Sequence, residues 1–68
     1  MLLPNLKKHR LLAGLTQEEL SELVGMHRVS INELENLKRP ARPRTLKRLA
    51  EVLGTDTRQL ADDGSLAQ

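Results

Sequence analysis

The chain has 68 residues, a formal net charge of +2, and neither cysteine nor aromatic residues. A domain of about 60 residues buries only about 60% of the surface that its unfolded chain exposes, which leaves little structure for a catalytic cleft. Without cysteine there are no disulfides and no thiolate metal sites, and without aromatic rings there are no stacking platforms of the kind that bind single-stranded nucleic acids and RNA.

The charged residues are unevenly distributed along the chain. Lys7, Lys8 and Arg10 form one basic group, and residues 38–48 contain a second group with no acid. The second group consists of Lys38, Arg39, Arg42, Arg44, Lys47 and Arg48. Such a run is either an ordinary solvated face or a surface for a polyanion, and the charges alone leave both interpretations open.

The sequence also lacks the patterns of membrane, secreted and catalytic proteins. No apolar run approaches the roughly 20 residues that span a membrane, and the first residues do not read as a signal peptide. His9 and His27 are the only histidines, and no nucleophile, metal-ligand spacing or glycine-rich phosphate loop accompanies them. We therefore expect a cytoplasmic protein with no enzymatic activity, no metal and no cofactor.

The first predicted helix covers residues 2–13 and ends at Gly14. Its apolar residues recur at helical spacing. The side chains expected to face the core are Leu2, Leu6 and either Leu11 or Ala13. Pro4 fits this helix only in its first turn, where the backbone needs no amide donor.

A second helix is expected to begin at Gln17. Thr16 and Glu19 have the spacing of a capping box, in which each side chain binds the backbone amide of the other residue. Ser21 is small, as a helix needs where another crosses it closely. Gly25 follows the apolar positions of this helix, where a C-terminus requires a left-handed residue. A tight turn is therefore predicted after residue 24.

The helix after this turn is expected from residue 28 to residue 36. His27 would be its N-cap, an unusual choice where Ser, Thr, Asp or Asn is preferred. The inward positions of this helix pair are Leu20, Ser21, Val24, Met26, Ile31 and Leu34. The outer face of the second helix carries His27, Arg28, Val29, Asn32, Glu33 and Asn36. A core has no use for this mixture, so we expect the outer face to contact another molecule.

Residues 37–42 are predicted to form a basic loop, because the residue before a proline is disfavoured in a helix and both Pro40 and Pro43 follow. A fourth helix, 43–53, begins with Pro43 and ends at Gly54. Its apolar positions are Leu46, Leu49, Ala50 and Leu53.

A last short helix is expected around Leu60, capped by Thr55 or Asp56. The domain would then span residues 1–62, and residues 63–68, which have no periodic pattern, would form a flexible tail. The sequence therefore predicts an all-α, compact domain of five helices.

Five segments in this order and spacing resemble a known family. They are LTQEEL at 15–20, the Gly25 turn, SINELEN at 30–36, Arg42-Pro43-Arg44, and LAEVLG at 49–54. Together they resemble the helix-turn-helix domain of the lambda-repressor-like or XRE class, which includes Cro proteins and small phage repressors. The resemblance implies a sequence-specific regulator of transcription, expected to be a repressor, whose third helix enters the major groove of double-stranded DNA.

The resemblance also implies roles for individual residues. The base-reading set would be His27, Arg28, Val29, Asn32 and Glu33. The phosphate-binding set would be Gln17, Ser30, Asn36, Lys38, Arg39, Arg42 and Arg44. Arg10 and Glu35 would form a partly buried pair joining the first and third helices. For Arg28 a phosphate contact, for Glu33 an internal pair with Arg28 or Arg39, and for Val29 simple exposure stay open as alternatives.

The sequence departs from the family pattern at both ends of the third helix. His27 replaces a small hydroxyl cap, and Leu37 stands where glycine is usual. The loop before the fourth helix is also one residue longer than in some relatives, so its individual phosphate contacts are not assigned.

The resemblance further implies a homodimer on a palindromic operator, in a bacterial or phage-encoded protein bound to the nucleoid. Leu53, Leu60 and Leu66 are candidates for the dimer surface, although Leu53 and Leu60 stand at positions that more often belong to a core. Two other interpretations stay open. One is an adaptor or antitoxin-like module that uses the same fold to bind another protein. The other is the DNA-binding part of a longer regulator.

Overall fold

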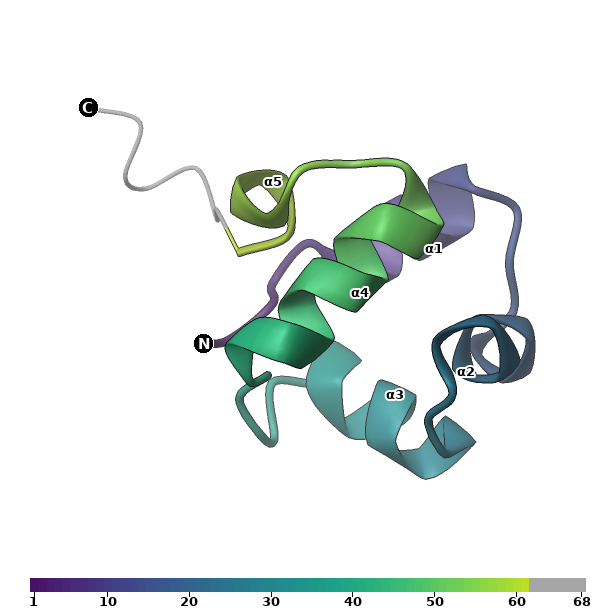
Figure 1. Cartoon of the computed structure of the whole chain (residues 1–68). Coiled ribbons are helices and arrows are strands. Elements are labelled where there is room, and N and C mark those ends of the chain that lie inside the picture. Colours follow the sequence, from purple (N-terminus) through teal and green to yellow (C-terminus); the bar gives the residue numbers. More distant parts are fainter. Residues whose placement is uncertain (62–68) are drawn as a thin grey trace.

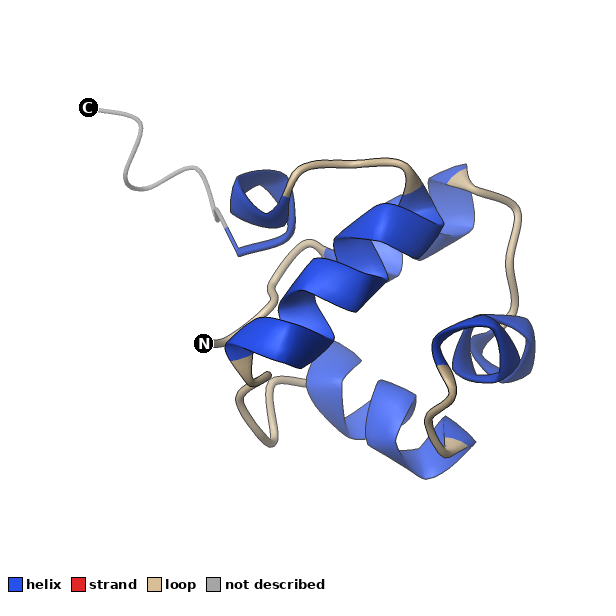
Figure 2. Ribbon diagram, in the orientation of Figure 1, coloured by secondary structure: helices blue, strands red, loops and turns tan. Residues whose placement is uncertain are grey.

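The computed structural model describes residues 1–61, which form five helices connected by loops and turns (Figures 1 and 2). These are α1 (Leu6–Leu12), α2 (Gln17–Val24), α3 (Arg28–Glu35), α4 (Pro43–Leu53) and α5 (Thr57–Ala61). The predicted all-α fold of five helices is confirmed. The tail predicted for residues 63–68 lies outside the described residues. Within residues 1–61, no helix is long and apolar enough to cross a bilayer.

The helices pack around one core of aliphatic side chains. In Figure 1, α4 crosses the molecule diagonally in front of α1, with α5 on one side of α4 and the α2–α3 pair on the other. α2 packs against α3 and α4, and α1 packs against α3 and α5. The side chains with almost no exposed surface are Leu3, Leu6, Leu20, Ile31, Leu34, Leu49 and Leu60. Every helix therefore contributes to the core that holds α3 in place.

Local sequence determines both ends of α2. Thr16 Oγ1 accepts from the Glu19 amide at 3.0 Å, and the Thr16 amide donates to Glu19 Oε1 at 2.9 Å. This is the predicted capping box, and it satisfies two amides that a helix start leaves unpaired. At the other end, Gly25 has a φ of 73°, which glycine adopts without the clash that a Cβ atom causes.

The first helix is shorter than predicted, and two of its three expected core positions are wrong. α1 begins at Leu6, and Leu3 is buried whereas Leu2 is 48% exposed. Leu11 and Ala13 are exposed as well, because the inward position one turn after Leu6 is taken by Arg10. An arginine can occupy this position because a buried carboxylate meets it.

Residues 1–5 instead form an N-terminal strap across two other parts of the fold. The Asn5 side chain donates to the Gln59 carbonyl at 2.8 Å, and the Asn5 amide donates to the Leu60 carbonyl at 3.2 Å. At the start of the strap, the Met1 nitrogen donates to the Ala41 carbonyl at 3.0 Å, and the Ala41 amide donates to the Met1 carbonyl at 2.7 Å. The strap therefore holds α5 and the loop before α4. Residues 1–5 make these contacts in place of the helix that was predicted for residues 2–5.

Candidate nucleic-acid interface

The turn between α2 and α3 is fixed by backbone contacts and by one side chain from α4. The Met26 amide donates to the Ser21 carbonyl at 2.9 Å, as expected after a left-handed residue at the end of a helix. Arg48 Nε donates to the Val24 carbonyl at 3.1 Å, so a carbonyl at the end of α2 gains a partner. Arg48 belongs to the basic run and is exposed, but its Nε also holds the end of α2. The sequence analysis missed this role.

A buried network joins α1, α2 and α3 at one carboxylate. Arg10 Nε lies 2.5 Å from Glu35 Oε2, and the two side chains are only 8% and 2% exposed. Gln17 Nε2 donates to Glu35 Oε1 at 3.0 Å, and Arg10 Nη1 donates to the Leu15 carbonyl at 2.7 Å. Among residues 1–61, no buried side-chain nitrogen or oxygen lacks a hydrogen-bond partner. The network therefore fixes α3 relative to the two helices before it.

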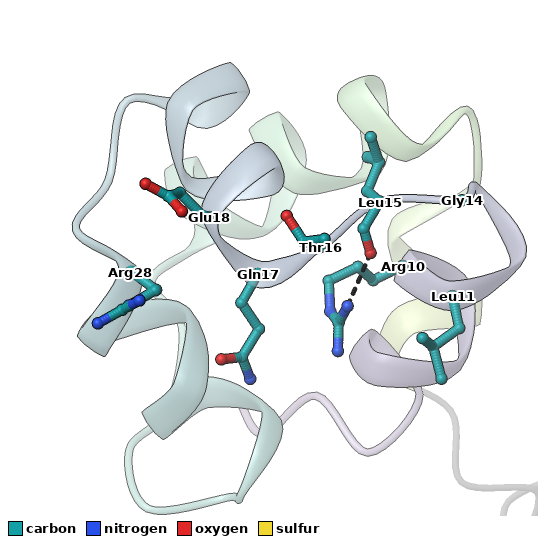
Figure 3. A pocket seen from close by; sticks show the side chains of 8 residues that line it. All are labelled: Arg10, Leu11, Gly14, Leu15, Thr16, Gln17, Glu18 and Arg28. Carbon is teal, nitrogen blue, oxygen red and sulfur yellow. Dashed lines mark hydrogen bonds between the residues drawn. The ribbon is translucent and has the colours of Figure 1, made fainter.

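A shallow cleft of about 550 Å³ opens beside this network (Figure 3). It lies between the end of α1, the start of α2 and the start of α3. Gln17 and Arg28 both line it, and Arg10 lies beneath Leu15 and donates to its carbonyl. The cleft thus brings together a residue predicted to bind phosphate and one predicted to read bases.

The start of α3 is capped by His27, as predicted. Its backbone is extended, with φ of −76° and ψ of 144°, and its side-chain Nδ1 accepts from the Val29 amide at 3.2 Å. The His27 carbonyl accepts the amides of Ser30 and Ile31 at 3.0 and 3.3 Å. An imidazole nitrogen therefore does the work that a hydroxyl or carboxylate oxygen does in most caps.

The outer face of α3 is open to solvent over its whole length. Most of the side chains predicted to read bases are exposed, and Glu33 and Ser30 are partly exposed. Glu33 Oε1 lies 3.3 Å from Arg39 Nη1, so of the two internal pairs considered for Glu33 the structure contains the one with Arg39. Asn36 Nδ2 donates to Asn32 Oδ1 at 3.1 Å on the same face.

Leu37 ends α3 in the conformation that glycine usually provides. Its φ is 57°, in the left-handed region, and it is the only non-glycine residue among 1–61 with positive φ. The Lys38 amide donates to the Glu33 carbonyl at 2.9 Å, which is the Schellman pattern of helix ends. The backbone therefore leaves α3 in the usual way for a helix end, but Leu37 has a Cβ atom where glycine would have none, and this strains its left-handed conformation.

The loop after α3 and the first turn of α4 present four basic residues to solvent. Lys38, Arg39, Arg42 and Arg44 are all exposed. Arg42 is the N-cap of α4, its side chain makes no cap hydrogen bond, and the first turn of α4 contains no acid. The residues of the predicted base-reading and phosphate-binding sets therefore lie at the start of α2, at the N-cap of α3 and along α3, in the loop after it, and at the start of α4. In residues 1–61 no group of His, Cys, Asp or Glu has the arrangement of a metal site.

Comparisons with known proteins agree with this geometry. A model of the helix-turn-helix family matches residues 6–60. Among solved structures, the chain is similar to the N-terminal DNA-binding domain of SinR, the master biofilm regulator of Bacillus subtilis, with 23% identity and a TM-score of 0.76 over 100% of both chains. This identity supports a shared fold. No curated protein matches the sequence. Because the match covers most of the chain, the protein belongs to the helix-turn-helix family, in its XRE-type branch of DNA-binding domains of transcription regulators, which are not enzymes.

Proposed function

We propose that this domain is a sequence-specific transcriptional repressor that inserts α3 into the major groove of a palindromic operator. The observation that carries the proposal is the outer face of α3: it is exposed and chemically mixed, yet the buried Arg10–Glu35–Gln17 network holds it rigidly. Rigid placement of a helix is what base reading requires, because each contact depends on atoms meeting within hydrogen-bond distance.

Each exposed side chain on α3 has a base edge that it suits. Arg28 would donate to guanine O6 and N7, Asn32 would pair with adenine N6 and N7, and Glu33 would accept from the cytosine amino group. Val29 is 53% exposed and would contact a thymine methyl group. Each good contact contributes about 1–3 kcal/mol of discrimination.

The Glu33–Arg39 pair is weak enough to open on DNA. Its side chains are 40% and 50% exposed, and an exposed pair of this kind is worth only about 0.2–1 kcal/mol. A cytosine contact by Glu33 and a phosphate contact by Arg39 would together exceed that value. We therefore infer that the pair separates when the domain binds.

The remaining polar residues would hold α3 in register through the DNA backbone. This set is Gln17, Ser30, Asn36, Lys38, Arg39, Arg42 and Arg44. Gln17 already donates one hydrogen to Glu35, but its amide carries two, so the second remains for a phosphate oxygen. Contacts of this kind give affinity without sequence preference and depend strongly on salt.

A homodimer would give the specificity that one module lacks, because two half-sites about one DNA turn apart double the bases read. Leu60 is fully buried, so of its two possible roles the structure shows the core position and not a dimer surface. Leu53 is partly buried, and Leu66 lies outside the described residues. The domain would act on the bacterial or phage nucleoid in the cytoplasm.

Selection of bound sequences from a random duplex pool tests this proposal. We expect enrichment of a site with two related halves whose centres lie about 10 base pairs apart. Enrichment of a single half-site would contradict the dimer. No enrichment, with no salt-dependent affinity for any duplex, would favour the adaptor or antitoxin-like alternative.

A further inference from the structure

The N-cap of α3 is a histidine, and one of its two ring nitrogens already makes a hydrogen bond to the helix. Nδ1 of His27 accepts from the Val29 amide at 3.2 Å, and the side chain is otherwise exposed. Oxygen-bearing residues are the usual choice here because they have several acceptor lone pairs. Neutral imidazole has one acceptor nitrogen and one donor nitrogen, so its use as a cap restricts what the rest of the ring can do.

This cap hydrogen bond determines which nitrogen carries the proton. A backbone amide can only donate, so Nδ1 must be unprotonated to accept from Val29. In the neutral ring the single proton is then on Nε2. The two ring nitrogens point in divergent directions, so Nε2–H faces away from the end of α3 and toward solvent. The cap therefore converts His27 into a donor on the outer face.

We infer that His27 contacts a hydrogen-bond acceptor of the DNA through Nε2–H, while Nδ1 holds the start of α3. The inference rests on the proposed docking of α3 in the major groove. The acceptors within this chemistry are guanine N7 and O6, adenine N7, thymine O4 and phosphate oxygens, whereas the amino groups of adenine and cytosine are excluded as partners. His27 is thus a donor to the DNA whose hydrogen-bond direction is set by the fold.

Nitrogen-resolved NMR of the histidine rings in the free domain tests the first step. The two tautomers of a neutral imidazole have distinct pairs of nitrogen shifts, so the spectrum shows which nitrogen carries the proton. We expect His27 to be held as the Nε2–H tautomer. A ring that is mainly protonated on Nδ1 would overturn the inference, whatever the domain binds.

Two substitutions separate capping from the DNA contact. His27→Asn supplies an acceptor for the cap and still presents an amide donor, whereas His27→Ser supplies the cap alone because its side chain is short. Both variants should melt at or above the wild-type temperature. On a duplex enriched from the random pool, His27→Asn should bind within about twofold of wild type, and His27→Ser about five- to tenfold more weakly, as expected for one lost hydrogen bond.

Modified duplexes identify the acceptor. Deazapurines lack N7, thio-substituted thymine and guanine have weaker acceptors at the positions of O4 and O6, and methylphosphonates lack a charged oxygen. One modification should weaken wild-type binding but leave His27→Ser binding almost unchanged, because the two changes remove the same bond. A base modification would assign the contact to a base edge, and a methylphosphonate would assign it to the backbone.

Three results would overturn the inference in distinguishable ways. If His27→Ser binds the enriched duplex as tightly as wild type, the ring makes no DNA contact. If it binds weakly but every modification costs both proteins equally, the ring acts only through the helix end. If no duplex is enriched at all, the proposed function fails, and the inference fails with it.

Discussion

Replacement of Arg10 by Met should lower the free energy of unfolding substantially, because it removes the cation that the buried Glu35 carboxylate faces. The two side chains are 8% and 2% exposed, so water cannot replace the lost partner easily. Breaking a buried pair by removing one member costs about 3–5 kcal/mol. At roughly 0.05–0.15 kcal/mol per residue, a chain of this length has a total stability of about 3–10 kcal/mol. Arg10→Met should therefore remove about a third of the stability or more.

Urea denaturation followed by far-ultraviolet circular dichroism measures this loss. Arg39→Met is the matched control, since it breaks the exposed pair with Glu33 and should cost less than about 1 kcal/mol. Combining Arg10→Met with Glu35→Leu should recover most of the loss, because replacing a whole buried pair by apolar groups is often neutral. If Arg10→Met costs no more than Arg39→Met, the Glu35 carboxylate is hydrated and the reasoning is refuted.

Three further substitutions test the local geometry by the same unfolding measurement. Thr16→Ala removes the cap acceptor for Glu19 and should cost about 1 kcal/mol, whereas no loss would mean that the capping box is not formed in solution. Leu37→Gly should stabilise the domain by roughly 0.5–1 kcal/mol. A left-handed residue with a Cβ atom costs about 1–2 kcal/mol, and glycine offsets part of that gain through its greater freedom in the unfolded chain. A destabilised variant would show that the contacts of the half-exposed Leu37 side chain outweigh the strain of its backbone. Arg48→Met keeps the aliphatic stem but leaves the Val24 carbonyl without its partner, so about 0.5–1.5 kcal/mol should be lost, and an equal loss from Lys47→Met would argue against this specific bond.

Features that depend on neighbouring residues were predictable from the sequence. The capping box needs only Thr16 and Glu19 at the right spacing, and Gly25 needs only its own backbone freedom. The family match over residues 6–60 likewise agrees with the resemblance seen in short motifs spread along the chain. These signals are local, and tertiary structure did not override them.

Features that depend on distant residues were predicted less well. Leu2 was expected to be in the core, but the strap that buries Leu3 instead is held by Gln59 and Leu60, more than 50 positions away. Arg48 was placed only in the basic run, and the sequence did not indicate that its Nε binds a carbonyl 24 positions earlier. No pattern of hydrophobicity or charge marks such contacts, because their cause is the packing of one helix on another. The roles of the exposed residues on α3 also stay predictions, since their partner is another molecule.

Two alanine substitutions test most directly whether α3 reads bases while the basic residues after it bind DNA phosphates. Arg28 lies on the outer face of α3, and Arg42 lies at the exposed start of α4. Arg58→Ala is the charge-matched control, because it removes one exposed cation from α5, which Figure 1 shows well separated from α3. Each variant would be titrated against the enriched duplex and a random duplex at several salt concentrations.

We predict that Arg28→Ala weakens binding to the enriched duplex by about 1–3 kcal/mol, relaxes preference at one base pair, and leaves the random duplex nearly unaffected. Arg42→Ala should weaken both duplexes alike and reduce the salt slope by about 0.9, the value for one phosphate contact. Arg58→Ala should change neither. Equal losses from Arg28→Ala on the enriched and random duplexes would contradict the central claim that the exposed face of α3 reads the sequence of the DNA.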